Sequence, residues 1–151
     1  MSFRIEHRIG VAAPASEVWA VVSDLARYGE WNPIYPVIEG RLSIGAPIRF
    51  ELHLPKKPVQ TFSGVIVDWV PNAQLVWALK LMGGLVRTTR YIEIEALTDD
   101  NCILSNGEIF DGLGARLLPK AERRTIKRAF EIVNEAAKAR VEDARREGRA
   151  P

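Results

Sequence analysis

Alternating hydrophobic and polar residues predict that most of this chain forms half-buried strands. Hydrophobic side chains recur at every second position in Phe3–Val11, and again in Ile48–Leu54, where the even-numbered positions would face a core. Alternation and β-branched residues predict further strands, including a short one at 37–39 and longer ones at 61–70, 75–81, 86–96 and 102–110. Short polar turns separate consecutive strands, which favours an antiparallel meander.

Two segments have helical spacing instead. Pro14 and Ser16 provide a start signal for a short helix, in which hydrophobic residues recur three and four apart at Val18, Val21, Val22 and Leu25. From about Lys120, an amphipathic pattern predicts a long terminal helix with one apolar stripe made by Ile126, Phe130, Val133, Ala137 and Val141. We expect a single domain over residues 1–147, followed by a frayed tail at 148–151.

An aromatic-rich segment follows the first predicted helix. Tyr28, Trp31 and Tyr35 lie between residues 23 and 36, in a stretch interrupted by Gly29, Pro33 and Pro36. The interruptions predict a short helical segment and a loop. Two interpretations are open for the rings: Trp31 closes one end of the core, or the rings form the mouth of a ligand cavity.

The order of the predicted elements indicates an α+β fold. One strand precedes two short helices, about six further strands and a long final helix, giving a curved antiparallel sheet of about seven strands. A twisted sheet of this size needs its inner face covered, and the terminal helix carries the only long apolar stripe. We expect the sheet to wrap around this helix and to leave an internal cavity between them.

Composition and charge narrow the possible functions. The sequence is 47% hydrophobic and 26% charged, with a formal net charge of +2. This charge is too small to indicate nucleic-acid binding, and the basic start of the terminal helix has glutamates but no interleaved aromatic residues. Transient contact of this basic segment with an anionic membrane stays open. No run approaches the ~20 apolar residues of a membrane span, so we expect a cytoplasmic protein without a signal peptide.

The residues that usually bind metals or cofactors are scarce. Cys102 is the only cysteine, which excludes an internal disulfide and a cysteine-based zinc site. His7 and His53 lie in predicted strands, and neither has a second ligand at metal-binding spacing. Gly83 and Gly84 lack the sequence context of a phosphate-binding loop. We expect no metal and no cofactor.

Arg90 and Glu108 are the most informative polar residues. Strand parity places Arg90 on the same face as Ile92 and Ile94, and a turn at Asp99 would pair Arg90 with Glu108. Asn106 would share this inner face. A buried charge needs a partner or a ligand, so these side chains could anchor a ligand's polar group. The alternative is that a bulge turns one of them outward.

The predicted ligand contacts combine this polar group with apolar side chains. Their members are Trp31, Tyr35, Phe50, Phe62, Trp77, Arg90, Asn106, Glu108, Phe110, Ile126 and Phe130. The apolar members are equally compatible with ordinary core packing. Only Arg90 and Glu108 are candidates for catalysis, as a pair that could polarise a carbonyl and move a proton.

Several motifs resemble the helix-grip superfamily of START-domain and birch-pollen-allergen-like proteins. They are the run from Val11 to Trp19, the following Ser-Asp-Leu25 with Tyr28, the Glu-Trp-Asn-Pro33 block and the segment Gly107–Leu113. Within this superfamily, the chain is most similar to bacterial polyketide cyclase/dehydrase-like and lipid-transport-like members. The resemblance covers nearly the whole chain and implies the helix-grip fold.

The resemblance leaves three functions open, because superfamily members include lipid carriers, cyclases and chaperone activators. The first is binding of a small hydrophobic ligand, such as a lipid, a polyketide-like molecule or an aromatic molecule. The second is a cyclase or dehydratase that uses Arg90 and Glu108. The third is a module that binds a protein partner. The sequence does not indicate the ligand's identity or the oligomeric state.

Overall fold

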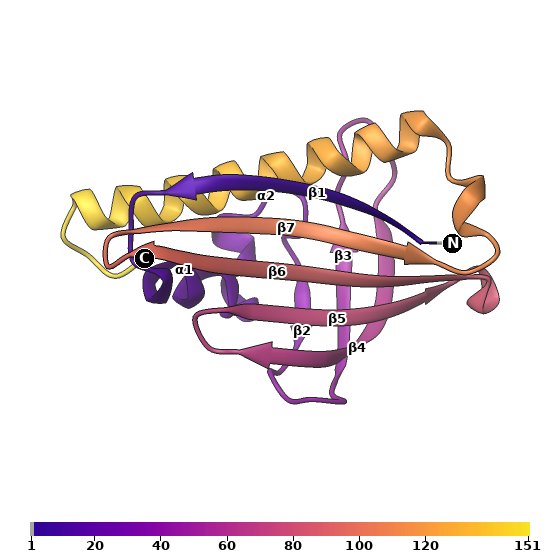
Figure 1. Ribbon diagram of the computed structural model, residues 1–151, viewed down its shortest axis with the longest axis horizontal. Helices are drawn as coiled ribbons and strands as arrows, with labels where there is room; N and C mark the ends of the chain where they lie inside the picture. The colour runs from indigo at the N-terminus through magenta and orange to yellow at the C-terminus, as the bar shows by residue number, and fades with distance from the viewer. Residues whose placement is uncertain (1) are drawn as a thin grey trace.

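The computed structural model describes residues 2–151 as an antiparallel sheet packed against a long helix (Figure 1). The elements, in chain order, are β1 (Phe3–Val11), α1 (Ala15–Val22), the 3₁₀ helix η1 (Leu25–Glu30), β2 (Ile38–Gly40), β3 (Pro47–Leu52), β4 (Gln60–Val70), β5 (Gln74–Leu81), the 3₁₀ helix η2 (Met82–Gly84), β6 (Val86–Thr98), β7 (Asn101–Asp111), the 3₁₀ helix η3 (Ala115–Leu117) and α2 (Lys120–Arg146). This confirms the predicted α+β fold, with two short helical segments after the first strand.

The seven strands form one sheet in the order β1-β7-β6-β5-β4-β3-β2, with all neighbours antiparallel. The sheet is strongly curved: β5, β6 and β7 run along the molecule, whereas β3 runs across it (Figure 1). Helix α2 lies along the sheet and contacts β1, β7 and α1. No helix within residues 2–151 is long and apolar enough to cross a membrane.

The core lies between the inner face of the sheet and α2. The predicted stripe of α2 is buried at Phe130, Val133, Ala137 and Val141, while Ile126, near the start of the helix, is half-buried. Their spacing of three and four residues keeps these side chains on one face of the helix. The helix therefore covers the sheet closely along most of its length but less closely at its N-terminal end.

Two details differ from the sequence prediction. Strand β3 ends at Leu52 rather than Leu54, because the chain enters the turn that contains Pro55, which has no N–H to donate to a ladder. The 3₁₀ helices η2 and η3 were not predicted. Gly83 and Gly84 both have positive φ, of 66° and 94°, which allows the tight connection between β5 and β6.

Candidate functional site

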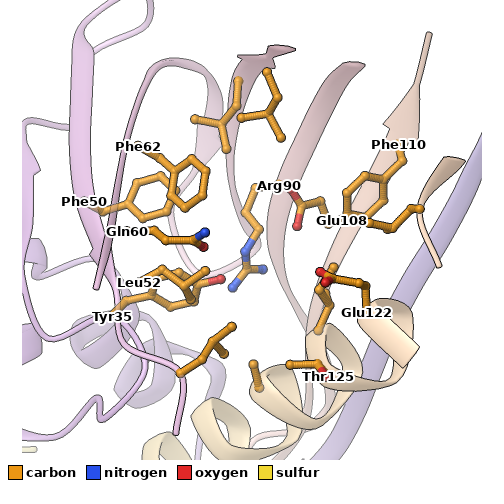
Figure 2. A pocket seen from close by; sticks show the side chains of 16 residues that line it. Tyr35, Phe50, Leu52, Gln60, Phe62, Arg90, Glu108, Phe110, Glu122 and Thr125 are labelled. Carbon is orange, nitrogen blue, oxygen red and sulfur yellow. The ribbon is translucent and has the colours of Figure 1, made fainter. Parts of the chain in front are cut away.

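A cavity of about 190 Å³ lies between the sheet and the N-terminal half of α2 (Figure 2). Most of its wall is apolar, and polar groups enter from a few positions. The residues that line it are Tyr35, Phe50, Leu52, Leu54, Gln60, Phe62, Leu79, Leu81, Arg90, Glu108, Phe110, Leu118, Glu122, Thr125, Ile126 and Ala129. The cavity thus occupies the region where α2 covers the sheet least closely.

Arg90 and Glu108 both face this cavity from neighbouring strands. They lie directly opposite each other in the β6–β7 ladder, as the sequence predicted. Directly opposed residues of an antiparallel pair share one face of the sheet. Figure 2 shows the Arg90 side chain extending into the middle of the cavity, with Glu108 on one side and Tyr35 on the other.

The Arg90 guanidinium is deeply buried but only partly hydrogen-bonded. Arg90 is only 2% exposed. Nη1 donates to Asn106 Oδ1 at 2.7 Å and to the Gly107 carbonyl at 3.1 Å, with a longer contact to the Tyr91 carbonyl at 3.4 Å. Nε has no hydrogen-bond partner, and no carboxylate within residues 2–151 forms an ion pair with the guanidinium.

Three aromatic rings supply much of the remaining environment of this cation. The guanidinium carbon lies 4.2 Å from the ring centroid of Phe130, 5.1 Å from that of Tyr35 and 5.5 Å from that of Trp77. The negative faces of aromatic rings attract a cation, more strongly where water is excluded. These rings offset part of the cost of burying Arg90, but they accept none of its N–H groups in a conventional hydrogen bond.

A chain of buried amides holds the guanidinium from the side of α2. Asn106 Nδ2 donates to Asn134 Oδ1 at 2.8 Å. Asn134 Nδ2 in turn lies 2.9 Å from both Nδ1 and the backbone oxygen of His7, on the edge strand β1. Asn106 and Asn134 are 1% and 0% exposed, so the bond between these two amides is shielded from water, whereas the bonds to His7 are partly buried. The network fixes Nη1 of a guanidinium that extends into the cavity (Figure 2).

Glu108 is the cavity carboxyl closest in the sheet to Arg90. Burial raises its pKa above the ordinary value, against the opposing effects of the Arg90 charge and the Thr88 hydroxyl. A raised pKa keeps more of this carboxyl protonated near neutral pH, and a protonated carboxyl can donate as well as accept a hydrogen bond. Glu122, from the first turn of α2, brings a second carboxyl to the wall on the same side of Arg90 (Figure 2).

Tyr35 reaches the cavity because the loop before it is fixed by Asn32. Asn32 Oδ1 accepts the backbone N–H groups of Ile34 at 3.0 Å and Tyr35 at 2.8 Å, and the asparagine is itself buried. The Tyr35 ring then meets Phe50 edge-on at 5.4 Å. Burial raises the pKa of the Tyr35 hydroxyl, so this group enters the cavity as a neutral phenol.

Comparisons with known proteins now place this fold. Residues 2–142 match the family described as polyketide cyclase / dehydrase and lipid transport. The chain belongs to this family. No curated protein matches the sequence. Because the match covers almost the whole chain, the family assignment applies to the sheet and to the cavity-lining part of α2.

Solved structures support the same fold for this polyketide cyclase/dehydrase-family protein. The Zhui aromatase/cyclase from Streptomyces sp. R1128 superimposes with a TM-score of 0.73 and 19% identity, over 95% of this chain and 96% of that one. A START superfamily protein from Mycobacterium smegmatis gives 0.72 and 19%, over 93% and 97%. Ara h 8.0201 gives 0.71 and 14%, over 95% and 99%. The predicted resemblance to the helix-grip superfamily is therefore confirmed.

Seven of the predicted ligand-contact residues line the cavity, and four do not. The seven are Tyr35, Phe50, Phe62, Arg90, Glu108, Phe110 and Ile126. Trp77, Asn106 and Phe130 lie behind the wall, where each contacts the Arg90 guanidinium. The structure thus places these three predicted ligand contacts against Arg90 rather than on the cavity wall.

Trp31, from the aromatic-rich loop, is not one of the residues that line the cavity. Its ring packs against Tyr28, with centroids 4.8 Å apart, and Tyr28 is anchored by a hydrogen bond from its hydroxyl to the Val22 carbonyl at 2.6 Å. Trp31 is half-buried in this cluster, beside η1. Trp31 therefore does not line this cavity, whereas Tyr35 of the same loop does.

Four polar residues of the site were not predicted from the sequence. Gln60, Glu122 and Thr125 lie on the cavity wall, and Asn134 supports Asn106. Asn134 had a readable signal, because it follows Phe130 by four residues and so places an amide inside the apolar stripe of α2. The other three lie at the edge of a strand or near the start of a helix, where periodicity does not show which way they face.

The donor set suits hydrogen bonding to a ligand rather than metal coordination. Within residues 2–151, no three histidine, cysteine or acidic side chains gather in a way that could hold a metal ion. The cavity instead offers a fixed cation, a carboxyl with a raised pKa and a neutral phenol around apolar walls. Such a site can orient a hydrophobic molecule by one polar group.

Proposed function

We propose that this protein binds a small hydrophobic molecule that carries one hydrogen-bond-accepting group, such as a carboxylate, a carbonyl or a phenol oxygen. The apolar part would occupy the space between Phe50, Phe62 and Ile126. The accepting group would lie between Arg90 and Glu108, where the guanidinium donates and the raised pKa of Glu108 favours the protonated, donating form of its carboxyl. The binding of a hydrophobic ligand is consistent with the family's description.

The observation that carries this proposal is the incomplete environment of Arg90. A charge buried without a carboxylate partner is costly, often by several kcal/mol. Here the side facing α2 is fully bonded through Asn106, while Nε has no partner. An ordinary structural arginine would have its donors paired within the fold. A ligand oxygen in the cavity would supply this cation with a further acceptor.

The size of the cavity limits the ligand. An apolar cavity of roughly 150 Å³ can hold benzene, whereas drug-sized molecules need pockets of roughly 300–1,000 Å³. At about 190 Å³, this cavity accommodates one or two rings, or a short chain. A longer lipid or polyketide would require α2 or the loop before Tyr35 to move. Native mass spectrometry of freshly purified protein would show whether a retained ligand is of the smaller or the larger kind.

A matched pair of probes tests the polar anchor. We expect 2-naphthoate to bind more tightly than 2-methylnaphthalene, which has the same rings but no accepting group. Arg90→Met should weaken naphthoate binding by roughly 10- to 100-fold, the value of one or more charged hydrogen bonds, and should change methylnaphthalene binding little.

Arg87→Met is the matched control, because Arg87 lies on the same strand and is exposed. It should leave both affinities unchanged. Isothermal titration calorimetry gives the four comparisons directly. Equal loss of both probes in Arg90→Met would show a damaged cavity rather than a lost anchor, and absence of saturable binding of either probe by the wild-type protein would refute the proposal.

A second function is favoured by Glu108. A carboxyl with a raised pKa beside a cation can act as a general acid or base on a bound carbonyl compound, as a cyclase or dehydratase requires. The structural neighbour from Streptomyces sp. R1128 is itself an aromatase/cyclase. Glu108→Gln separates the two functions: an enzyme would lose turnover of a poly-β-ketone substrate while keeping its affinity, and a carrier would show no turnover in either form.

A further inference from the structure

Four large apolar side chains are exposed together at one end of the molecule. Met82 and Leu85 come from the β5–β6 connection and are 67% and 52% exposed, while Leu113 and Leu117 come from the β7–α2 connection and are 88% and 76% exposed. These four residues are called the apolar tip below. Figure 1 shows the two connections side by side at the end of the sheet away from the C-terminus.

The two connections are held together by backbone contacts. The Gly114 N–H donates to the Leu85 carbonyl at 3.1 Å. Gly112 allows this approach, since its φ is 101° and a Cβ at this position would lie 2.4 Å from the Leu85 oxygen. The apolar tip is therefore one surface built from two segments that are distant in sequence.

Exposed cations lie close in sequence to the residues of the apolar tip. They are Lys80, Arg87, Arg116, Lys120, Arg124 and Lys127. Three of these follow one face of α2 at spacings of four and three residues, and none of the six forms an ion pair within residues 2–151. The segments 80–87 and 111–127 contain only two carboxylates, Asp111 and Glu122. This end is thus strongly positive, although the whole chain has a net charge of only +2.

We propose that the apolar tip and its cations dock on an anionic lipid bilayer. Projecting leucines and a methionine can enter the boundary between headgroups and acyl chains, while nearby lysines and arginines contact the anionic headgroups. A stable protein interface uses roughly 20–30 residues on each side. This end offers about half that number on two loop tips and the first turns of a helix, which suits insertion into a fluid surface better than a protein partner.

The position of the surface would place the cavity close to the membrane. Leu81 and Leu118 line the cavity and are the immediate sequence neighbours of Met82 and Leu117 of the apolar tip. Docking would therefore bring one edge of the cavity wall to the level of the headgroups. The membrane proposal does not depend on ligand binding, because the exposed side chains and charges are present in the empty protein.

Sedimentation with vesicles tests the docking surface. We expect the full chain to bind vesicles of phosphatidylcholine with one quarter phosphatidylserine, to bind pure phosphatidylcholine vesicles much more weakly, and to be released by added salt. Lys120→Glu/Arg124→Glu/Lys127→Glu should lower the partition coefficient by more than 100-fold, since each cation near an anionic surface accounts for roughly fivefold. Leu113→Asp/Leu117→Asp should lower it at least tenfold.

Ile44 provides the matched control, because it is 67% exposed and lies outside both segments of the apolar tip. Ile44→Asp should bind as the wild-type protein does, and thermal unfolding confirms that each variant is folded. Failure of the wild-type chain to bind the anionic vesicles would overturn the proposal, as would normal binding by the folded leucine variant. Retained capture of an acidic protein without vesicle binding would assign the surface to a protein partner instead.

A fluorescent label measures insertion directly. Leu113→Cys and Ile44→Cys, each in a Cys102→Ala background and labelled with a polarity-sensitive dye, should differ on anionic vesicles. We expect a blue shift and higher intensity only at position 113. Equal responses at both positions would show that the protein adheres without inserting its apolar tip, and would overturn the proposed geometry. Because these measurements use no cavity ligand, their outcome is separate from that of the naphthoate titration.

Discussion

The buried amide network makes a quantitative prediction about Asn106. Asn106→Leu keeps the approximate volume of the side chain but removes two buried hydrogen bonds, to Arg90 at 2.7 Å and to Asn134 at 2.8 Å. The first involves a charged donor and contributes about 2 kcal/mol, and the second contributes about 1 kcal/mol. Because the variant also leaves the Arg90 charge without its main acceptor, we expect the free energy of unfolding to fall by about 3–4 kcal/mol.

The same substitution should cost much less when the charge is absent. In an Arg90→Met background, Asn106→Leu loses only the bond to Asn134, so we expect a cost of about 1 kcal/mol. The resulting coupling between Arg90 and Asn106 is then about 2–3 kcal/mol, within the range found for residues of one network. Arg90→Met alone should change the free energy of unfolding by no more than about 1 kcal/mol. It removes favourable hydrogen bonds, but it also removes the cost of burying a charge whose Nε has no partner, and the two effects oppose each other.

Urea unfolding of the four proteins measures this cycle, provided that their m-values agree. Ser105→Ala is a suitable control, since Ser105 is the adjacent buried polar residue and its hydroxyl forms no hydrogen bond with Arg90, Asn106 or Asn134. Its cost should be the same with and without Arg90. If Asn106→Leu costs the same in both backgrounds within about 0.5 kcal/mol, the usual limit of additivity, Asn106 does not hold the guanidinium and the reasoning fails.

Three further predictions concern the cavity and the sheet. Burial raises the pKa of Glu108, so above the ordinary carboxyl pKa of about 4.3 the folded protein binds more protons than the unfolded chain. The free energy of unfolding, relative to that of Glu108→Gln, should therefore fall as the pH rises from about 4.3 toward the raised pKa. Urea unfolding at a series of pH values measures this difference. A bound naphthoate should change the fluorescence of Trp77, which lies beside Arg90, so Trp77→Phe should lose the response and Trp31→Phe should keep it. Gly107→Ala should lower the free energy of unfolding by about 1–3 kcal/mol, because its Cβ would lie 2.2 Å from the Tyr91 hydroxyl oxygen.

The register of β6 against β7 was predictable from the sequence, although a bulge intervenes. The chain turns at residues 99–100, and Thr98 pairs with Asn101. A ladder continued regularly from this pair would have placed Arg90 opposite Ile109. A register shift between Ala96 and Thr98 restores the predicted pairing with Glu108. Alternation succeeded because the inward hydrophobic residues of both strands fix the parity far from the turn.

The loop between η1 and β2 could not be predicted in the same way. Trp31 and Tyr35 are both aromatic and lie four residues apart, yet only Tyr35 reaches the cavity. Their directions depend on the backbone bonds that Asn32 accepts and on the packing of Trp31 against Tyr28. Neither follows from a hydrophobic period, because irregular backbone has none. Composition therefore indicated that the loop covers something, but not which ring reaches the cavity.

The division of Arg90 into a bonded and an unbonded side distinguishes the site from a polar defect in a core. Selection for stability alone would pair every donor or replace the arginine with an apolar residue. Instead, Asn106 and Asn134 fix Nη1 from the side of α2, while Nε is buried without a partner and the Arg90 side chain lines the cavity. A donor held in place before the ligand arrives loses little conformational entropy on binding. The network would thus let a small cavity bind the proposed ligand's accepting group in a defined orientation with few direct contacts.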